Sequence, residues 1–408
     1  MSQCVVAAPA TDWPLVVKCA ALVAAVQFFV ALEGSMLLPL GPMLSDALGF
    51  PTDHLGYLNS SFLAAAAIAG LIGSLFLDRF ERRVALSVAL GGLAVATGMA
   101  ALASSLEGLM WCRFIAGLCG GPAAALGLAV IGDTAPVEVR GRAIGAVAAG
   151  SGLAIILGVP LALVTAEWVG WRVMFLLAGL LGLALALGAA LLLPNRLGHL
   201  SRQNGREVWA DFRGMLAQRS TLMALGATGL VFASTHALAS NLASYLVYNL
   251  GVPQSDLKFI WSAGGVAGLA GSQLASHLSD RLGAVRMFWG VSVLTVPAFY
   301  LFFVQTGTTL APMLMFCVFM ACVSARFVLI QTINSLASRA GNRGRFMSLI
   351  GANNQAASAL ILLVCGQVLY TAPGGALVRM DWLGWFGICA ALLSAWLAWL
   401  PLRGNGAE

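Results

Sequence analysis

The segment LGFPTDHLGYLNSSFLAAAAIAGLIGSLFLDRFERR, residues 48–83, decides the fold of this chain. Its central run, roughly 55–77, is apolar and has the ~20 residues that a helix needs to cross a bilayer. The run lies between Leu-Gly-Phe-Pro at 48–51 and Asp-Arg at 78–79. Both landmarks return 202 residues later, as Leu-Gly-Val-Pro at 250–253 and Asp-Arg at 280–281. The segment therefore predicts a membrane helix that occurs in two copies.

A third pair of landmarks supports an internal repeat. Arg-Gly-Arg at 140–142 returns as Arg-Gly-Arg at 343–345, an offset of 203 residues. The three pairs of landmarks are separated by nearly the same number of residues. This indicates two halves with the same order and orientation of helices. Parallel repeats of this kind enclose a central cavity in transporters that rock to alternate access to it.

The composition extends this prediction to the whole chain. Of the 408 residues, 60% are hydrophobic and 9% charged, whereas a soluble domain has about 25% charged residues. This excludes a soluble enzyme. Apolar runs separated by polar breaks predict twelve membrane helices, at roughly 14–40, 55–77, 84–105, 109–131, 142–166, 171–193, 221–249, 257–279, 285–305, 310–335, 346–370 and 380–402.

We therefore expect an all-α membrane protein with twelve transmembrane helices in two pseudosymmetric six-helix bundles, residues 1–193 and 221–408. The longest polar stretch, 194–220, lies between them and contains arginines together with apolar residues at helical spacing. An amphipathic connector helix at the membrane surface fits this pattern, and a solvated linker is the alternative.

The distribution of positive charge predicts the orientation. With the N-terminus inside, sixteen of the 22 Lys and Arg residues fall in cytoplasmic segments and three fall outside. This bias predicts cytoplasmic termini in a cell inner membrane. It also explains the net charge of +6 without a nucleic-acid partner.

Residues 74–83, SLFLDRFERR, resemble the G-x-x-x-D-R-x-G-R-R motif of the major facilitator superfamily. Ser74 and Glu81 replace its two glycines, and a second partial copy begins at Ser276. Arg113 to Gly117 resembles the R-x-x-x-G motif of the same family.

The fifth predicted span carries a further resemblance. Residues 150–160 resemble a degenerate antiporter motif, in which Val159 separates Gly158 from Pro160. Together with Gly-Trp-Arg at 170–172, they are similar to sugar-efflux members of the drug:proton antiporter branch.

The resemblance implies a transporter with the major facilitator fold and a cytoplasmic conformational latch. The latch is expected to use Asp78, Arg79, Arg82, Arg83, Asp133, Arg142, Asp280 and Arg281. The replacement of the motif's glycine by Glu81 is expected to weaken this latch. Four residues are expected to shape helix packing, by close approach or by a kink: Gly117, Gly121, Gly158 and Pro160.

Ionisable residues at bilayer depth are the candidates for proton coupling, because they are costly to bury. Glu33 and Arg113 lie at similar depths in the first and fourth spans, so an ion pair across the cavity is possible. Burial disfavours the charged carboxylate and a nearby guanidinium favours it, so solvent access can switch its protonation. The alternative roles are interhelical hydrogen bonding or substrate contact for Glu33, and for Arg113 a buried charge satisfied by backbone carbonyls. His236, 203 residues after Glu33, is a third candidate, and packing is its alternative.

Polar side chains within the spans are the candidates for substrate binding. They are Gln27, Arg326, Asn241, Tyr245, Asn353, Asn354 and Gln355. Arg326 suits either an anionic group or a backbone carbonyl.

We predict a secondary active transporter that exports a small organic solute in exchange for protons. The alternatives are proton-coupled uptake of a siderophore-like or organic-acid solute, or a receptor of the same fold. The chain has no ATP-binding G-x-x-x-x-G-K-[ST] motif and no metal or nucleophile motif, so we expect no cofactor, no metal and no enzyme activity. The expected partners are the solute, protons and the bilayer, and we expect a monomer.

Overall fold

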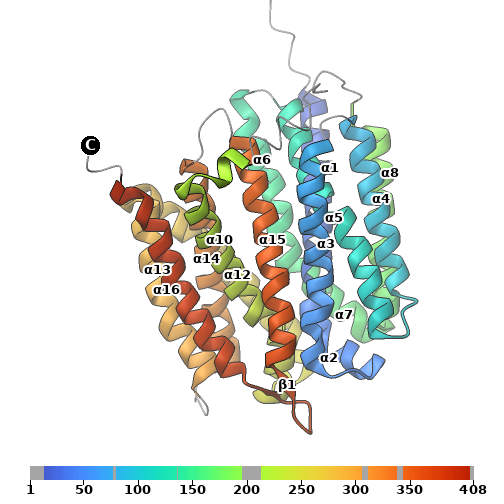
Figure 1. The fold of residues 1–408 in the computed structure, drawn as a ribbon. Coiled ribbons are helices and arrows are strands. Elements are labelled where there is room, and N and C mark those ends of the chain that lie inside the picture. Colours follow the sequence, from blue (N-terminus) through green and yellow to red (C-terminus); the bar gives the residue numbers. More distant parts are fainter. Residues whose placement is uncertain are drawn as a thin grey trace, which may run out of the picture.

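The computed structural model describes residues 13–76, 80–135, 137–194, 213–305, 311–337 and 343–404. Long helices run side by side between two ends of the molecule (Figure 1). One end carries the start of α1 (Trp13–Ser35) and the end of α16 (Met380–Gly404), and we call it the terminal end. At the other, the hairpin end, β1 (Tyr370–Thr371) and β2 (Leu377–Val378) form an antiparallel pair.

The first half of the repeat ends at residue 194. After α1 it contains α2 (Leu37–Leu48), α3 (Leu55–Phe76), α4 (Arg82–Ala100), α5 (Leu106–Thr134), α6 (Val137–Leu153), α7 (Val159–Val169) and α8 (Trp171–Leu192). A π-helical turn, Ala154–Gly158, joins α6 to α7, and Pro160 lies in the first turn of α7. The wider turn accommodates the backbone bond that proline cannot donate.

The second half follows the predicted connector. It contains α10 (Arg219–Ala239), α11 (Leu242–Ser244), α12 (Leu257–Leu282), α13 (Ala284–Phe299), α14 (Pro312–Ala337), α15 (Arg343–Val368) and α16. Two π-helical turns extend α11 and α13, over Tyr245–Asn249 and Tyr300–Val304. Short 3-10 turns, Thr52–His54 and Gln254–Asp256, precede α3 and α12.

Twelve segments of the described chain match the predicted spans. Eleven are long and apolar enough to cross a membrane. The twelfth, α12, is long enough at 26 residues, but Gln273, Ser276 and His277 make it more polar. The first span runs further than predicted: α1 breaks at Met36 and α2 continues to Leu48, rather than stopping near residue 40.

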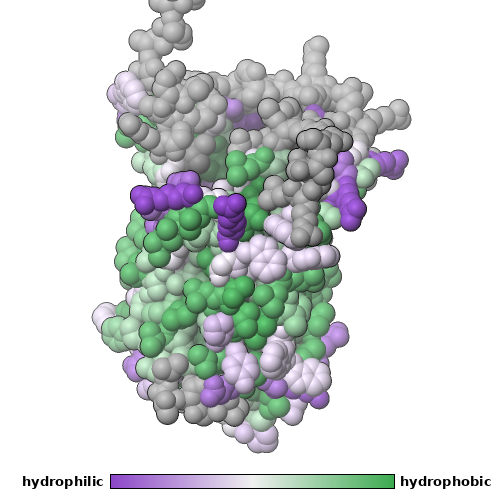
Figure 2. Space-filling model, turned by 90° about the vertical axis from the view of Figure 1, so that its left-hand side faces the viewer, coloured by the Kyte–Doolittle hydropathy of each residue, from purple (hydrophilic) through white to green (hydrophobic). Residues whose placement is uncertain are grey.

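Apolar side chains cover the middle of the molecule's surface. Figure 2 shows a hydrophobic band there, with hydrophilic residues concentrated towards the two ends. Leu102, Trp168 and Leu191 are among the large apolar residues that are more than two thirds exposed. A lipid environment explains an exposed surface of this kind. The chain is therefore a multi-pass membrane protein.

The two halves pack directly against each other. Helix α3 lies against α15, α7 against α12, and α2 against α11. Gly56 makes the first contact possible, because a Cβ there would lie 2.7 Å from the carbonyl oxygen of Leu362. A Cβ at Gly366 of α15 would likewise lie 2.7 Å from the ring of Tyr57 in α3.

Most of the predicted connector, residues 195–212, lies outside the described residues. Of its described part, Met215 is buried against Phe346, Leu349 and Ile350 of α15. The connector thus contacts the second half at the terminal end.

Candidate functional site

Glu33 and Arg113 form a buried ion pair. Glu33 lies in the last turn of α1 and Arg113 in the second turn of α5. Arg113 Nη1 lies 2.5 Å from Glu33 Oε1, and Nη2 donates to the backbone carbonyl of Glu33 at 3.1 Å. Because α1 ends at Ser35, the carbonyls of its last turn need partners from outside the helix. Arg113 therefore binds both the side chain and the backbone at the break in α1.

The pair lies inside the first half rather than across a cavity between the halves. The guanidinium stacks on the ring of Phe62 from α3, 4.4 Å from its centroid. Thr97 of α4 lies beside the carboxylate. Each member of the pair is 1% exposed. Glu33 Oε2 has no hydrogen-bond partner among the described residues, so this oxygen is available to carry a proton.

His236 lies in the last turn of α10 and contacts α15. Its Nδ1 is 3.0 Å from the Phe232 carbonyl and 3.0 Å from Ser358 Oγ. Ser358 donates its own proton to the Asn354 carbonyl. Both neighbours of Nδ1 are therefore acceptors, which assigns the proton of neutral His236 to Nδ1. Nε2 is then the nitrogen that accepts a further proton.

The helix break after α10 gathers polar groups next to His236. Asn241 is fully buried and neither atom of its amide has a partner among the described residues. Ser244 is also fully buried, with its hydroxyl unpartnered in the described part. Ser240 accepts a hydrogen bond from Asn59 of α3 at 2.9 Å, which joins the two halves. Tyr245 donates to the carbonyl of Phe302 at 3.0 Å.

The other predicted substrate residues are dispersed. Gln27 donates to the Ala124 carbonyl within the first half. On α15, Asn353 donates to the Leu225 carbonyl, Asn354 is buried beside Ser358, and Gln355 is half-buried. Arg326 is fully buried in the second half, where it donates to Ser394 of α16. The structure thus brings Asn241 and Tyr245 close to one helix break and leaves Gln27 and Arg326 in separate bundles.

The predicted latch is described only in part. Arg82 pairs with Asp133 at 3.2 Å, and Arg83 pairs with Glu81 at 3.2 Å. Glu81, which replaces the family's glycine, is the N-cap residue of α4.

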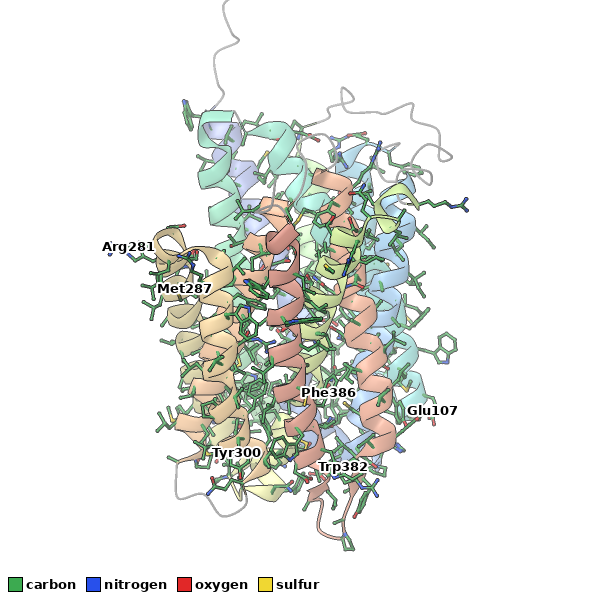
Figure 3. The ribbon with its side chains drawn as sticks, turned by 60° about the vertical axis from the view of Figure 1, so that its left-hand side comes forward. Glu107, Arg281, Met287, Tyr300, Trp382 and Phe386 are labelled. Atoms are coloured by element: carbon green, nitrogen blue, oxygen red, sulfur yellow. The ribbon has the colours of Figure 1, made fainter. Side chains whose placement is uncertain are left out.

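Other members of the latch have no described contact. Asp78 and Arg79 lie outside the described residues, as does the side chain of Arg142. Asp280 and Arg281 lie near the end of α12 at the terminal end, where Figure 3 labels Arg281.

The predicted glycines do permit close packing. A methyl group on Gly117 would overlap the Phe62 carbonyl of α3, and one on Gly121 would lie 2.9 Å from the Ala66 carbonyl. A methyl group on Gly158 would lie 2.9 Å from the ring of Phe28 in α1.

A set of polar contacts between the halves was not predicted. At the hairpin end, Thr52 and Asp53 bond to Thr371, and Tyr248 bonds to Asp46. Asp46 and Tyr248 are 202 residues apart, so they occupy corresponding positions in the two halves.

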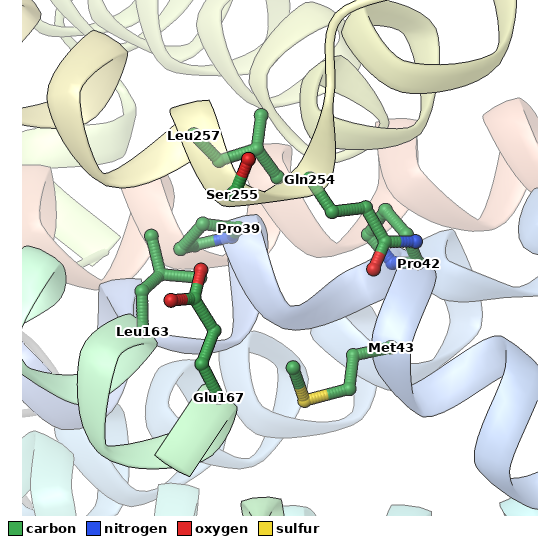
Figure 4. Close-up of a pocket in the computed structure, with 8 residues that line it drawn as sticks. All are labelled: Pro39, Pro42, Met43, Leu163, Glu167, Gln254, Ser255 and Leu257. Carbon is green, nitrogen blue, oxygen red and sulfur yellow. The ribbon is translucent and has the colours of Figure 1, made fainter.

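A further contact between the halves is ionic. Lys258 lies 2.7 Å from Glu167. Glu167 also lines a small pocket between the halves, drawn in Figure 4 with Pro39, Pro42, Met43, Leu163, Gln254, Ser255 and Leu257.

Comparisons with known proteins agree with this architecture. The family model described as Major Facilitator Superfamily matches residues 23–361. A chloramphenicol resistance protein of Streptomyces lividans is 26% identical over 247 residues, 60% of this chain and 62% of that protein. A probable sugar efflux transporter of Pasteurella multocida is 27% identical over 176 residues, 43% of this chain and 42% of that protein. These alignments span less than two thirds of either relative.

Among solved structures, a D-xylose-proton symporter has the same fold. It superposes with a TM-score of 0.74 at 15% identity, over 94% of this chain and 97% of that one. The likeness confirms the predicted fold class.

Proposed function

Because the chain belongs to the Major Facilitator Superfamily, we propose that it exports a small organic solute in exchange for protons, by alternating access. The observation that carries this proposal is the Glu33–Arg113 pair. It is the only ion pair between fully buried side chains in the described residues. A buried charge pair at a helix break is costly to keep, which favours a functional role for it.

Proton binding at Glu33 would change the forces on α1. Protonation removes the charge that pairs with Arg113, and it leaves the guanidinium held by the Glu33 carbonyl and the Phe62 ring. The contact between α1 and α5 then weakens next to the break at Met36. We propose that this change couples the proton to movement of α1, and that His236 is a second proton-binding group through Nε2.

The solute is proposed to bind at the break between α10 and α11. Asn241 and Ser244 offer unpartnered donors and acceptors there, and Tyr245 and Phe302 add aromatic surface. A solute with hydroxyl groups and an apolar part satisfies both kinds of surface. The names of the two relatives, which concern sugar efflux and resistance to chloramphenicol, support this class.

We propose that the two halves are closed against each other on the outer side of the membrane. The polar contacts between the halves described above gather at the hairpin end. The positive-inside rule assigns this end to the outer surface. In this conformation the contacts between the two halves at the hairpin end separate the solute site from the outside.

The test uses purified protein in proteoliposomes with an imposed pH gradient. Chloramphenicol and a panel of pentoses and hexoses are the probes. We expect movement of one probe class against the proton gradient, and loss of that coupling in Glu33→Gln. Glu107→Gln is the matched control, because Glu107 is exposed on the same helix as Arg113, as Figure 3 shows.

Three outcomes overturn the proposal. Full pH-driven export by Glu33→Gln excludes Glu33 as the coupling residue. Movement of the solute with the protons would establish uptake instead of exchange. Binding of a probe without its exchange across the bilayer would establish a receptor.

A further inference from the structure

Arg326 is a fully buried cation that has no acidic partner among the described residues. It lies near the middle of α14 and is 0% exposed. Nη2 donates to Ser394 Oγ at 3.1 Å, while Nε and Nη1 have no hydrogen-bond partner among the described residues. Arginine stays protonated in proteins, so the positive charge remains in the bundle.

The described acidic residues of the second half are too far along their helices to pair with Arg326. From residue 221 onward the chain has four: Asp256, Asp280, Asp381 and Glu408. Asp381 precedes Ser394 by 13 residues of α16, which corresponds to about 20 Å. Glu408 lies outside the described residues.

The two acidic residues of α12 are equally distant. Gly268 of α12 faces Ser324, two residues before Arg326. Asp256 and Asp280 are each 12 residues from Gly268, or about 18 Å along the helix direction. No carboxylate of α12 therefore reaches the guanidinium.

The helix register brings a second unpartnered group to the same level. Phe299 of α13 packs against Phe319 of the antiparallel α14, with the ring centroids 5.5 Å apart. Ser292 precedes Phe299 by seven residues and Arg326 follows Phe319 by seven, so both lie at one level. Ser292 is fully buried and its hydroxyl has no partner among the described residues.

Helix α16 closes the third side of this level. Tyr300, the first residue of the π-helical turn that follows α13, contacts Trp385 of α16 at the hairpin end (Figure 3 labels Tyr300). Ser292 lies eight residues before Tyr300, and Ser394 lies nine residues after Trp385. The two serines are therefore at nearly the same distance from this contact, and so at the same level. Ser394 donates to the Ala391 carbonyl, so towards Arg326 it acts as the acceptor.

Three buried donors without a partner among the described residues thus lie at one level of the neighbouring helices α13 and α14, beside α16: Arg326 Nε, Arg326 Nη1 and Ser292 Oγ. Ala325 and Ala395, next in sequence to Arg326 and Ser394, are nearly or fully buried, and the thiol of Cys322 interacts with the guanidinium. A net positive charge with hydrogen-bond donors and no carboxylate is the chemistry that binds an anion. Arg326 and Ser292 are both fully buried, which favours a monatomic anion over a larger carboxylate solute.

We propose that the second half holds a chloride ion at Arg326, Ser292 and the facing turn of α16. The ion compensates the buried arginine and joins three helices. This site is separate from the transported solute and from Glu33, so it does not depend on the proposed function.

The test measures thermal unfolding of the purified protein in detergent, in sodium chloride and in sodium gluconate at equal ionic strength. We expect the unfolding midpoint to rise by several degrees with chloride, in a saturable manner, and bromide to replace chloride. Ser292→Ala should raise the halide concentration needed by about tenfold, since it removes one donor. Ser272→Ala, at a half-buried position of α12, is the control and should leave the dependence unchanged.

Arg326→Gln should abolish the halide dependence. If that variant does not fold, Ser292→Ala alone decides the question. A crystal grown in bromide should show anomalous density between Arg326 and Ser292. The proposal is overturned if gluconate and chloride give the same midpoint, if Ser292→Ala leaves the halide dependence unaltered, or if the bromide density lies elsewhere.

Discussion

At the scale of the residue, the two buried arginines differ in how their charge is compensated. Arg113 has a carboxylate, a backbone carbonyl and an aromatic face around it. Arg326 has one serine oxygen among the described residues. Removing one member of a buried pair leaves an uncompensated charge, whereas removing both members does not. The pairing of Glu33 with Arg113 therefore has a measurable signature in stability.

We expect Glu33→Gln and Arg113→Gln each to destabilise the protein by about 3–5 kcal/mol, the usual cost of breaking a buried pair. The double variant Glu33→Gln with Arg113→Gln should be less destabilised than the sum of the two, because it buries no unpaired charge. Tryptophan fluorescence during thermal unfolding in detergent measures all three. Additive losses would show that the two residues act independently.

At the scale of the element, small residues and helix breaks determine how the spans approach one another. Helix α1 breaks after Ser35 and α10 breaks after Ala239, at corresponding places in the two halves. Each break lies beside a candidate functional residue, Glu33 or His236. Within the first half, α5 meets α3 across Gly117, where a side chain would overlap the backbone.

Gly117→Ala is expected to destabilise the protein by about 1–3 kcal/mol, the usual cost of overpacking a core. The added methyl group forces α5 away from α3 and disturbs Arg113, one turn away on the same helix. Gly91→Ala is the matched control, because a Cβ at Gly91 of α4 meets nothing within 4 Å. Thermal unfolding of both variants checks the prediction, and equal midpoints for the two would contradict it.

At the scale of the whole molecule, the polar contacts at the hairpin end hold the two halves together. Thr52 and Thr371 belong to different halves, and their hydroxyl oxygens are 3.1 Å apart. Alternating access requires such contacts to separate once in each cycle. A covalent bond at this place should therefore stop the cycle without unfolding the protein.

The variant Thr52→Cys with Thr371→Cys should lose solute exchange when oxidised and regain it when a reductant is added. Each single variant, treated in the same way, is the control. Exchange of solute in proteoliposomes and the shift of the cross-linked band on a gel are the two measurements. Full exchange by the cross-linked protein would show that the hairpin end stays closed throughout transport.

Hydropathy, charge bias and a repeat offset determined the membrane class, the twelve spans and the duplication from sequence alone. Hydropathy and charge bias can be read along the sequence without knowledge of the packing, because the bilayer requires every span to be apolar and biases positive charge to one side. The depth of Glu33 and Arg113 followed from the same reasoning, because residue spacing along a helix measures depth.

Only the tertiary structure decided which way the polar side chains face. It placed the Glu33–Arg113 pair inside the first half, directed Arg326 towards Ser394, and brought Asp53 to Thr371 through a hairpin that hydropathy does not register. The physical reason is that the direction of a side chain depends on how helices rotate and pack against their neighbours. Small residues far apart in sequence, such as Gly56 and Gly366, control that packing.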